Sequence, residues 1–379
     1  MECVVHRVGG LLKRDMNHRE RFVRALTGQE VDRVPFIKVF GGTNAIVPQW
    51  EREYPGIGQC IDQLLQFEGE YRGWQIAPVN MDLASLGPTE VIEEDAIRLV
   101  QRRGDGLVEL VRKDGDYHRQ ALEWPVKGRA DWERVKARHL RADDPERFPQ
   151  DWPEYVARLR ARDYPLQLTH QGVYGFARNL MGDEALAYAF YDDPELVHDM
   201  MSSYTDMTIA VWERMTAEVD FDLIECWEDM AYGRGALVSP ETFRQFLKPQ
   251  YQKIRRFADE HGIQIILVDS DGYIEPLTKL MLEAGVTALY PYEVQSENDV
   301  GRMLDAHLTL GAIGGLDKRV MSQGKEAIER EMVKARELIR KGRFIPGPDH
   351  FVLSDVTFEA YCYFMRRLRE VVMSTRPGE

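Results

Sequence analysis

From residue 151 onward, short apolar runs alternate with longer stretches in which apolar residues recur at helical spacing. Because strand and helix alternate strictly, this pattern predicts a parallel sheet. Several of the short runs are apolar at consecutive positions, which indicates burial on both faces of the sheet. The predicted strands are LQLTHQG, DLIEC, IQIILVD, TALYP, LTLGAIGG and FIPG, and the predicted helices cover 151–162, 183–217, 240–260, 273–284, a stretch between the last two strands, and Thr357 to about Val372.

A barrel and a doubly wound nucleotide-binding sheet both fit such a pattern. No GxGxxG follows the first strand, however, and neither GxxxxGKS nor GxxxxGKT occurs in the chain, so the phosphate-binding loops of nucleotide-binding folds are missing. We therefore predict an α/β fold of the (β/α)8 TIM-barrel class. The run FIKVF, which follows Pro35 and precedes Gly41, is its predicted first strand.

A single barrel domain is predicted for residues 17–375, preceded by a flexible extension over residues 1–16. The domain begins with a helix from Asn17 to Gly28, because an N-cap asparagine is followed three residues later by glutamate and the helix closes on glycine. From about 74 to 124, short β-rich runs and turn signals predict a β-hairpin insertion over one end of the barrel.

Charge and composition exclude several classes of partner. The 379 residues carry 49 Lys and Arg against 63 Asp and Glu, a net charge of −14, so nucleic acid and anionic membranes are repelled at long range. No apolar run reaches the length of a bilayer span, and the first residues lack the pattern of a secretory signal. Four scattered cysteines form no CxxC pair. We expect a cytoplasmic protein without a disulfide framework.

Candidate chemistry is sought where the strands end, because working residues of parallel barrels lie at the carboxyl ends of the strands. Polar residues accumulate there: His170, Gln171 and Tyr174, then Glu225, Trp227, Glu228 and Asp229, then Asp269, Ser270 and Asp271, then Tyr292 and Glu293, then Asp317, and finally Asp349 and His350. Several carboxylates at one mouth repel one another unless they are protonated, paired with cations or bound to a metal.

A metal site made of Asp269, Asp271 and His350 is the economical explanation. The two aspartates are two residues apart on a segment leaving a strand, so both can face the mouth, and oxygen with imidazole ligation suits Zn²⁺ and other divalent ions. The alternative is that both aspartates cap the following helix and that His350 binds backbone in its loop.

The remaining candidates are acids, a base and aromatic rings. Glu225, Glu228 and Asp271 are the candidate catalytic carboxylates. For Glu225, Glu228 and Asp229, the structural alternative is a salt bridge with Arg234 or another barrel arginine. His170, Tyr174, Arg178, Trp227 and Tyr292 are the candidate substrate-binding residues. A guanidinium can hold a substrate carboxylate and aromatic rings can enclose a flat ligand, although barrels also use both for packing.

Longer segments of the chain resemble a known superfamily. They are NHRERFVRALTGQEVDRVPF, YGFARNLMG, ALVSPETFRQFLKPQYQKI, DSDGYIEPLTKLMLEAGVTALYP and FIPGPDHFVLSDVTFEAYCYF. Together they make the chain similar to the uroporphyrinogen decarboxylase-like superfamily from about residue 17 to 375. The resemblance implies a TIM barrel, and the shared fold alone does not imply a shared reaction.

Within that superfamily, the chain departs from the true decarboxylases. Their first strand is followed by an arginine-rich loop that binds the substrate's carboxylates, whereas the corresponding segment here reads KVFGGTNAI. The cobamide-dependent methyltransferase branch is the closer match. Its zinc-binding His-x-Cys pair corresponds to Asp269, Ser270 and Asp271, and its distant cysteine falls near Asp349 and His350.

Replacement of thiolates by carboxylates implies a harder Lewis acid, which favours an oxygen ligand over a thiol. The resemblance therefore implies a corrinoid-linked methyltransferase that demethylates a methoxy compound and passes the methyl group to a cobalamin-type corrinoid on a partner protein, with Zn²⁺ as the metal. Related barrels often pair, so a homodimer is also expected. The alternative is a metal-independent decarboxylase or lyase in which Arg178 and a carboxylate act on a small acid.

Overall fold

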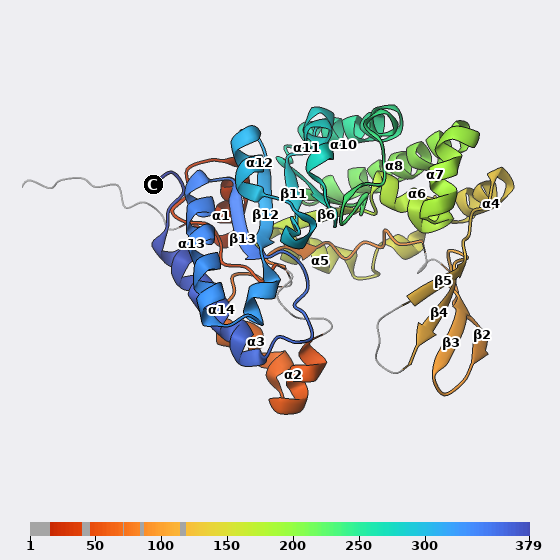
Figure 1. The fold of residues 1–379 in the computed structure, drawn as a ribbon. Coiled ribbons are helices and arrows are strands. Elements are labelled where there is room, and N and C mark those ends of the chain that lie inside the picture. Colours follow the sequence, from red (N-terminus) through yellow and green to blue (C-terminus); the bar gives the residue numbers. More distant parts are fainter. Residues whose placement is uncertain (1–15, 40–45, 71, 84–86, 114–118) are drawn as a thin grey trace, which may run out of the picture.

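The protein is described here by a computed structural model that covers residues 16–39, 46–70, 72–83, 87–113 and 119–379 (Figure 1). The extension expected over residues 1–16 lies, apart from Met16, outside the described residues. Helix α1 spans His18–Thr27, with Asn17 as its N-cap, a capping box to Glu20, and Gly28 closing it at φ 71°. The first predicted helix is therefore confirmed together with both of its caps.

A curled parallel sheet of seven strands forms the centre of the molecule, with helices around its outer face (Figure 1). All neighbouring strands are parallel. The strands, in their order across the sheet, are β1 (Gln75–Ile76), β6 (Leu166–His170), β7 (Leu223–Trp227), β10 (Ile265–Asp269), β11 (Ala288–Tyr290), β12 (Gly311–Leu316) and β13 (Phe344–Pro348). The six strands predicted after residue 151 are all present, and the TIM-barrel class is confirmed.

The described part of the predicted first strand FIKVF, Phe36 to Val39, occupies the eighth position of the barrel but forms no strand ladder. A Cβ added to Gly347 would lie 2.3 Å from Val39, and one added to Gly73 would lie 2.4 Å from Ile37, so the segment lies between β13 and the residues before β1. Its backbone makes hydrogen bonds to Glu68 and not to a neighbouring strand: the Phe36 N–H donates to the Glu68 carboxylate (2.9 Å), and the Phe36 carbonyl accepts from the Glu68 N–H (2.8 Å). The expectation of a regular strand is wrong for this reason.

Helices cover the outer face of the sheet and follow the strands in turn. They are α5 (Trp152–Arg160), α6 (Val173–Met181), α7 (Asp183–Asp192), α8 (Pro194–Thr216), α9 (Pro240–Thr242), η3 (Phe243–Leu247), α10 (Lys248–Glu260), α11 (Glu275–Ala284), η4 (Val294–Ser296), α12 (Val300–Ala306), η5 (Lys318–Met321), α13 (Lys325–Lys341) and α14 (Phe358–Ser374). The sheet and these helices enclose one continuous apolar core. Within the described ranges, every helix is too short or too polar to pass through a bilayer.

A separate antiparallel sheet projects from the barrel (Figure 1). Its strands are β2 (Glu90–Glu94), β3 (Arg98–Arg102), β4 (Val108–Arg112) and β5 (Arg119–Glu123), and α4 (Arg129–His139) follows it. Gln75–Ile76, which the sequence places inside this insertion, belongs instead to the barrel sheet as β1. A two-residue strand has too little periodicity to be recognised as part of a barrel. Elsewhere, α2 (Val47–Glu53) and α3 (Ile57–Leu65) precede β1, and the hairpin β8 (Ala231–Tyr232) and β9 (Gly235–Ala236) follows β7.

Candidate metal centre

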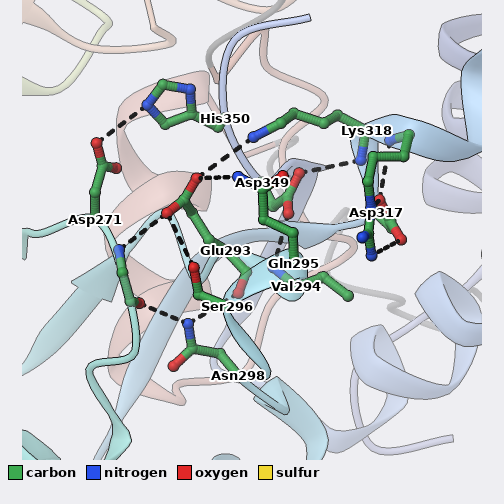
Figure 2. A network of polar contacts seen from close by, with 12 residues as sticks. Asp271, Glu293, Val294, Gln295, Ser296, Asn298, Asp317, Lys318, Asp349 and His350 are labelled. Carbon is green, nitrogen blue, oxygen red and sulfur yellow. Dashed lines mark hydrogen bonds and ion pairs between the residues drawn. The ribbon is translucent and has the colours of Figure 1, made fainter. Parts of the chain in front are cut away.

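Three side chains converge beyond the carboxyl ends of β10, β11 and β13. Asp271, Glu293 and His350 each offer a ligand atom, and these atoms lie within 4.8 Å of one another. His350 Nε2 lies 3.2 Å from Asp271 Oδ2, as Figure 2 shows. Two carboxylates and an imidazole on three different loops are a donor set that could hold a divalent metal ion.

Glu293 is held in position by both neighbouring loops (Figure 2). Its Oε2 accepts the Gly272 N–H at 2.9 Å, and its Oε1 lies 3.4 Å from the Lys318 ammonium, which is buried with it. The Asn298 amide donates to the carbonyls of Gly272 (2.8 Å) and Glu293 (2.9 Å) and so ties the two loops together. Gly272 has φ 83°, and a Cβ there would lie 2.7 Å from the backbone of Ala231, so the close approach requires glycine.

Asp349, next to His350, has a structural role. It is fully buried and accepts backbone N–H groups from Val294 (2.7 Å) and Lys318 (3.0 Å). Burial raises the pKa of Asp349, and the Lys318 charge opposes that shift. Both carboxylate oxygens are therefore engaged with backbone, which leaves His350 as the group that this loop presents to the centre (Figure 2).

Asp269 does not share one ligand set with Asp271 and His350, contrary to the prediction. It is the last residue of β10 and its side chain lies 3.2 Å from Arg72 Nη1, which also lies 3.0 Å from Glu225. Burial raises the pKa of Asp269 well above its usual range, and the neighbouring Glu225 charge adds to this. Asp269 still belongs to a second acidic group with Asp229 and Asp271, whose carboxylate oxygens also lie within 4.8 Å.

Glu225 and Glu228, both predicted to be catalytic, have different environments. Burial raises the pKa of Glu225, and Arg72 opposes the shift. Glu228 is fully buried and accepts three backbone N–H groups at the start of α6, at 2.7 Å, 2.8 Å and 3.0 Å, from Val173, Tyr174 and Gly175. It also accepts the hydroxyl of Tyr251. Its oxygens satisfy the free donors of a helix N-terminus, which gives Glu228 a structural role at the start of α6, and its catalytic role stays a prediction.

Three of the predicted substrate-binding residues are buried. His170 is fully buried against the rings of Tyr204 (4.8 Å) and Trp212 (5.9 Å), and burial lowers its pKa to about 3. Tyr174 is buried and its hydroxyl donates to Asp183 at 3.1 Å. Tyr292 is 1% exposed. Of the three, only His170 lies in a strand, at the end of β6; Tyr174 lies in α6 and Tyr292 lies beyond β11, so burial at each position is decided by packing that the sequence pattern does not record.

Arg178 and Trp227 do lie at the mouth. Trp227 is the last residue of β7 and is 45% exposed, and the Arg178 guanidinium lies 5.7 Å from its ring centroid. Arg178 also lies 3.3 Å from Asp229 Oδ2. Burial raises the pKa of Asp229, the charge of Asp271 adds to the shift, and Arg178 opposes it. Arg178 therefore balances the negative charge of the acidic group, and the same position would also allow it to bind a substrate carboxylate.

A cleft of about 820 Å³ opens between the antiparallel sheet and the barrel. Its barrel wall includes Ile76, Phe176 and Trp227, and its sheet wall includes Leu107, Ala121 and Trp124. The volume lies in the range of small-molecule sites. Of the cleft walls, only Trp227 was selected from the sequence. Arg72 and Glu293 were not selected, although Glu293 follows a predicted strand and so carried a signal.

The model of the uroporphyrinogen decarboxylase (URO-D) family matches residues 134–371, which is more than half of the chain. The chain belongs to the URO-D family.

Among solved structures, a methyltransferase from Methanosarcina mazei is similar to this URO-D family member with a TM-score of 0.62 and 17% identity, covering 94% of this chain and 99% of that one. The crystal structure of a putative vitamin-B12 independent methionine synthase from Listeria monocytogenes matches with a TM-score of 0.32 and 12% identity, covering 57% of this chain and 68% of that one. No curated protein matches the sequence. The resemblance to the superfamily is thus confirmed, and the first structural likeness supports the barrel fold.

Proposed function

We propose that this URO-D family member is a metal-dependent methyltransferase that demethylates a methoxy compound and passes the methyl group to a corrinoid carried by a partner protein. The observation that carries the proposal is the convergence of Asp271, Glu293 and His350 within 4.8 Å at the mouth of the barrel. The methyltransferase name of the Methanosarcina mazei structure adds support. The corrinoid and the methoxy substrate rest on the family resemblance and on the ligand chemistry.

The donor set fits a divalent ion such as Zn²⁺. Catalytic zinc sites commonly use three protein ligands and leave the fourth position to substrate or water. Asp271 Oδ1 is buried and has no hydrogen-bond partner among the described residues, which is costly unless a ligand occupies it. Lys318 adds one positive charge beside Glu293, so the two carboxylates do not face each other unbalanced.

When bound, a divalent ion supplies Lewis acidity at the oxygen of the methoxy group. The residues of the chain then have separate roles. Asp271, Glu293 and His350 hold the ion, while Gly272 and Lys318 orient Glu293. A reduced corrinoid on the partner protein would supply the nucleophile that accepts the methyl group, while the oxygen would keep the electron pair of the broken O–CH₃ bond and take up a proton. Glu225 is the remaining candidate for the proton donor, because the Glu228 carboxylate accepts the backbone N–H groups at the start of α6.

A metal-independent decarboxylase or lyase remains the second candidate because Arg178 lies at the mouth beside the exposed ring of Trp227. A substrate carboxylate would bind that guanidinium in place of Asp229, which now lies 3.3 Å from it. This displacement leaves the Asp229 carboxylate without its counter-charge, which makes the second function the less favoured one.

The test is metal content by elemental analysis of the purified protein, of Asp271→Ala and His350→Ala, and of the control variants Asp355→Ala and His307→Ala, which change residues outside the centre. About one divalent ion per chain in the wild type and controls, lost in the two centre variants, supports the proposal. Methyl transfer from 2-methoxyphenol to cob(I)alamin should follow the same pattern. Wild-type protein without metal that releases CO₂ from a carboxylic acid would instead establish the second candidate.

A further inference from the structure

The cleft between the antiparallel sheet and the barrel is the strongest feature that the metal centre does not explain. Its two walls come from parts of the chain far apart in sequence. Phe176 in α6 stacks on Tyr204 with ring centroids 3.9 Å apart, so that wall is rigid. Ile76 and Trp227 line the same wall, yet are 44% and 45% exposed. Large apolar side chains left open on the wall of a concave site favour a ligand that covers them.

Charged residues of the cleft are paired with one another. Arg103 lies 2.9 Å from Asp105, and Arg119 lies 3.4 Å from Glu109. A fifth charge, Asp82, is exposed and accepts from the Gln171 amide at 3.5 Å. Among the described residues that line the cleft, both arginines are thus paired with carboxylates, which leaves no spare cation for an anionic ligand.

One polar side chain of the barrel wall remains available. The Asn179 amide lines the cleft and has no hydrogen-bond partner among the described residues. An amide offers both a donor and an acceptor, so it can bind a hydroxyl or an ether oxygen on an otherwise apolar molecule.

The cleft is connected to the metal centre through a short chain of contacts. Trp227 borders the cleft and pairs in register with Asp269 of the next strand. Arg178 lies over the Trp227 ring and beside Asp229, whose Oδ1 accepts the Asp271 N–H at 3.3 Å. A molecule seated in the cleft therefore meets the mouth of the barrel at Trp227.

We propose that this cleft binds the body of an uncharged aromatic substrate and that the antiparallel sheet is the element that selects it. The inference deepens the proposed function and rests on it for the identity of the reacting group. Binding in the cleft itself requires no metal, because none of the wall residues belongs to the Asp271, Glu293 and His350 group. An experiment can therefore contradict the cleft assignment without contradicting the proposed metal-dependent function, and the reverse.

The test uses the fluorescent probe 6-methoxy-2-naphthol, with 6-methoxy-2-naphthoate as the anionic comparison. Ala121→Trp fills the cleft from β5, whereas Leu122→Trp places the same ring on the other face of that strand, where Leu122 is 48% exposed. Asn179→Phe fills the cleft from the opposite wall if Ala121→Trp does not fold, and circular dichroism checks folding.

We expect the wild type to bind the naphthol at least about tenfold more tightly than the naphthoate. Ala121→Trp should raise the Kd for the naphthol about tenfold or more, while Leu122→Trp and Asp271→Ala stay within about twofold. Absence of saturable binding to the wild type, equal binding of naphthol and naphthoate, or equal effects of the two tryptophan variants would overturn the inference. A wild type that binds the naphthol but neither binds a divalent metal ion nor transfers a methyl group would overturn the proposed function and leave the cleft assignment standing.

Discussion

The two sides of the barrel mouth are built in opposite ways. On the side of β10, β11 and β13, short side chains are fixed by hydrogen bonds to backbone, and Lys318, Asp349 and Glu293 are all buried (Figure 2). On the side of β1, β6 and β7, apolar rings border an open cleft, and Trp227 is 45% exposed. A metal ion requires fixed ligands at short range, whereas the body of a ligand requires area and shape. In the function proposed above, one side would carry the chemistry and the other the recognition.

The largest effect is expected when Asp271 and Asp269, which are two residues apart, are changed one at a time and Zn²⁺ binding of the two variants is compared. Asp271→Ala should weaken Zn²⁺ binding about 1,000-fold, because it removes one of three ligands, whereas Asp269→Asn should change it less than about tenfold. Competition with a chromophoric chelator measures both Kd values. Equal losses in the two variants would show that Asp269, as predicted from the sequence, is a ligand after all.

The rigidity of the polar side can be tested through Asp349. Asp349→Ala leaves two buried N–H groups, of Val294 and Lys318, without an acceptor, and should lower the free energy of unfolding by about 3 kcal/mol. Asn179→Ala, on the cleft side, should change it by less than about 0.5 kcal/mol. Urea denaturation of both variants checks the contrast, which fails if the two lose similar stability.

The recognition side also carries a buried imidazole that makes stability depend on pH. The pKa of His170 is lowered to about 3 in the folded state, whereas an unfolded histidine titrates near about 6.5. As pH falls below about 6.5 the unfolded chain binds a proton that the folded chain does not, so the contribution is present above that pH and is lost towards pH 3. The wild type should therefore lose about 2 kcal/mol more than His170→Phe between pH 7 and pH 5.

Urea denaturation at the two pH values measures this difference for both proteins. Parallel pH dependence of wild type and His170→Phe would show that the imidazole is not responsible.

The smallest effect is expected at Lys318, which orients a ligand without binding the ion. Lys318→Met should weaken Zn²⁺ binding about tenfold, because the Glu293 carboxylate loses its fixed ammonium at 3.4 Å. Lys318→Arg should recover part of the loss. Tighter binding in Lys318→Met would mean instead that the ammonium competes with the metal for Glu293.

Part of the candidate site could be predicted from the sequence because the ends of barrel strands can be recognised from the pattern of apolar and polar residues. Asp271 and His350 were selected as residues that follow strands, and the structure brings them to 3.2 Å. Glu228 and His170 follow strands too, yet one anchors α6 and the other packs against α8. A shift of one residue in an extended segment reverses the face to which a side chain points, and loop backbone decides that shift.

Local signals were sufficient for the class of fold. Strict alternation of strand and helix implied a parallel sheet, and the Asn17 capping box with Gly28 marked α1 at both ends. These features depend on neighbours within a few residues, so the sequence alone determined them. Tertiary structure decided the rest: Arg72 reaches Glu225 and Asp269 across more than 150 positions of sequence, and the cleft forms only where the antiparallel sheet meets α6. Contacts over such distances depend on how whole elements pack, which no local pattern of residues records.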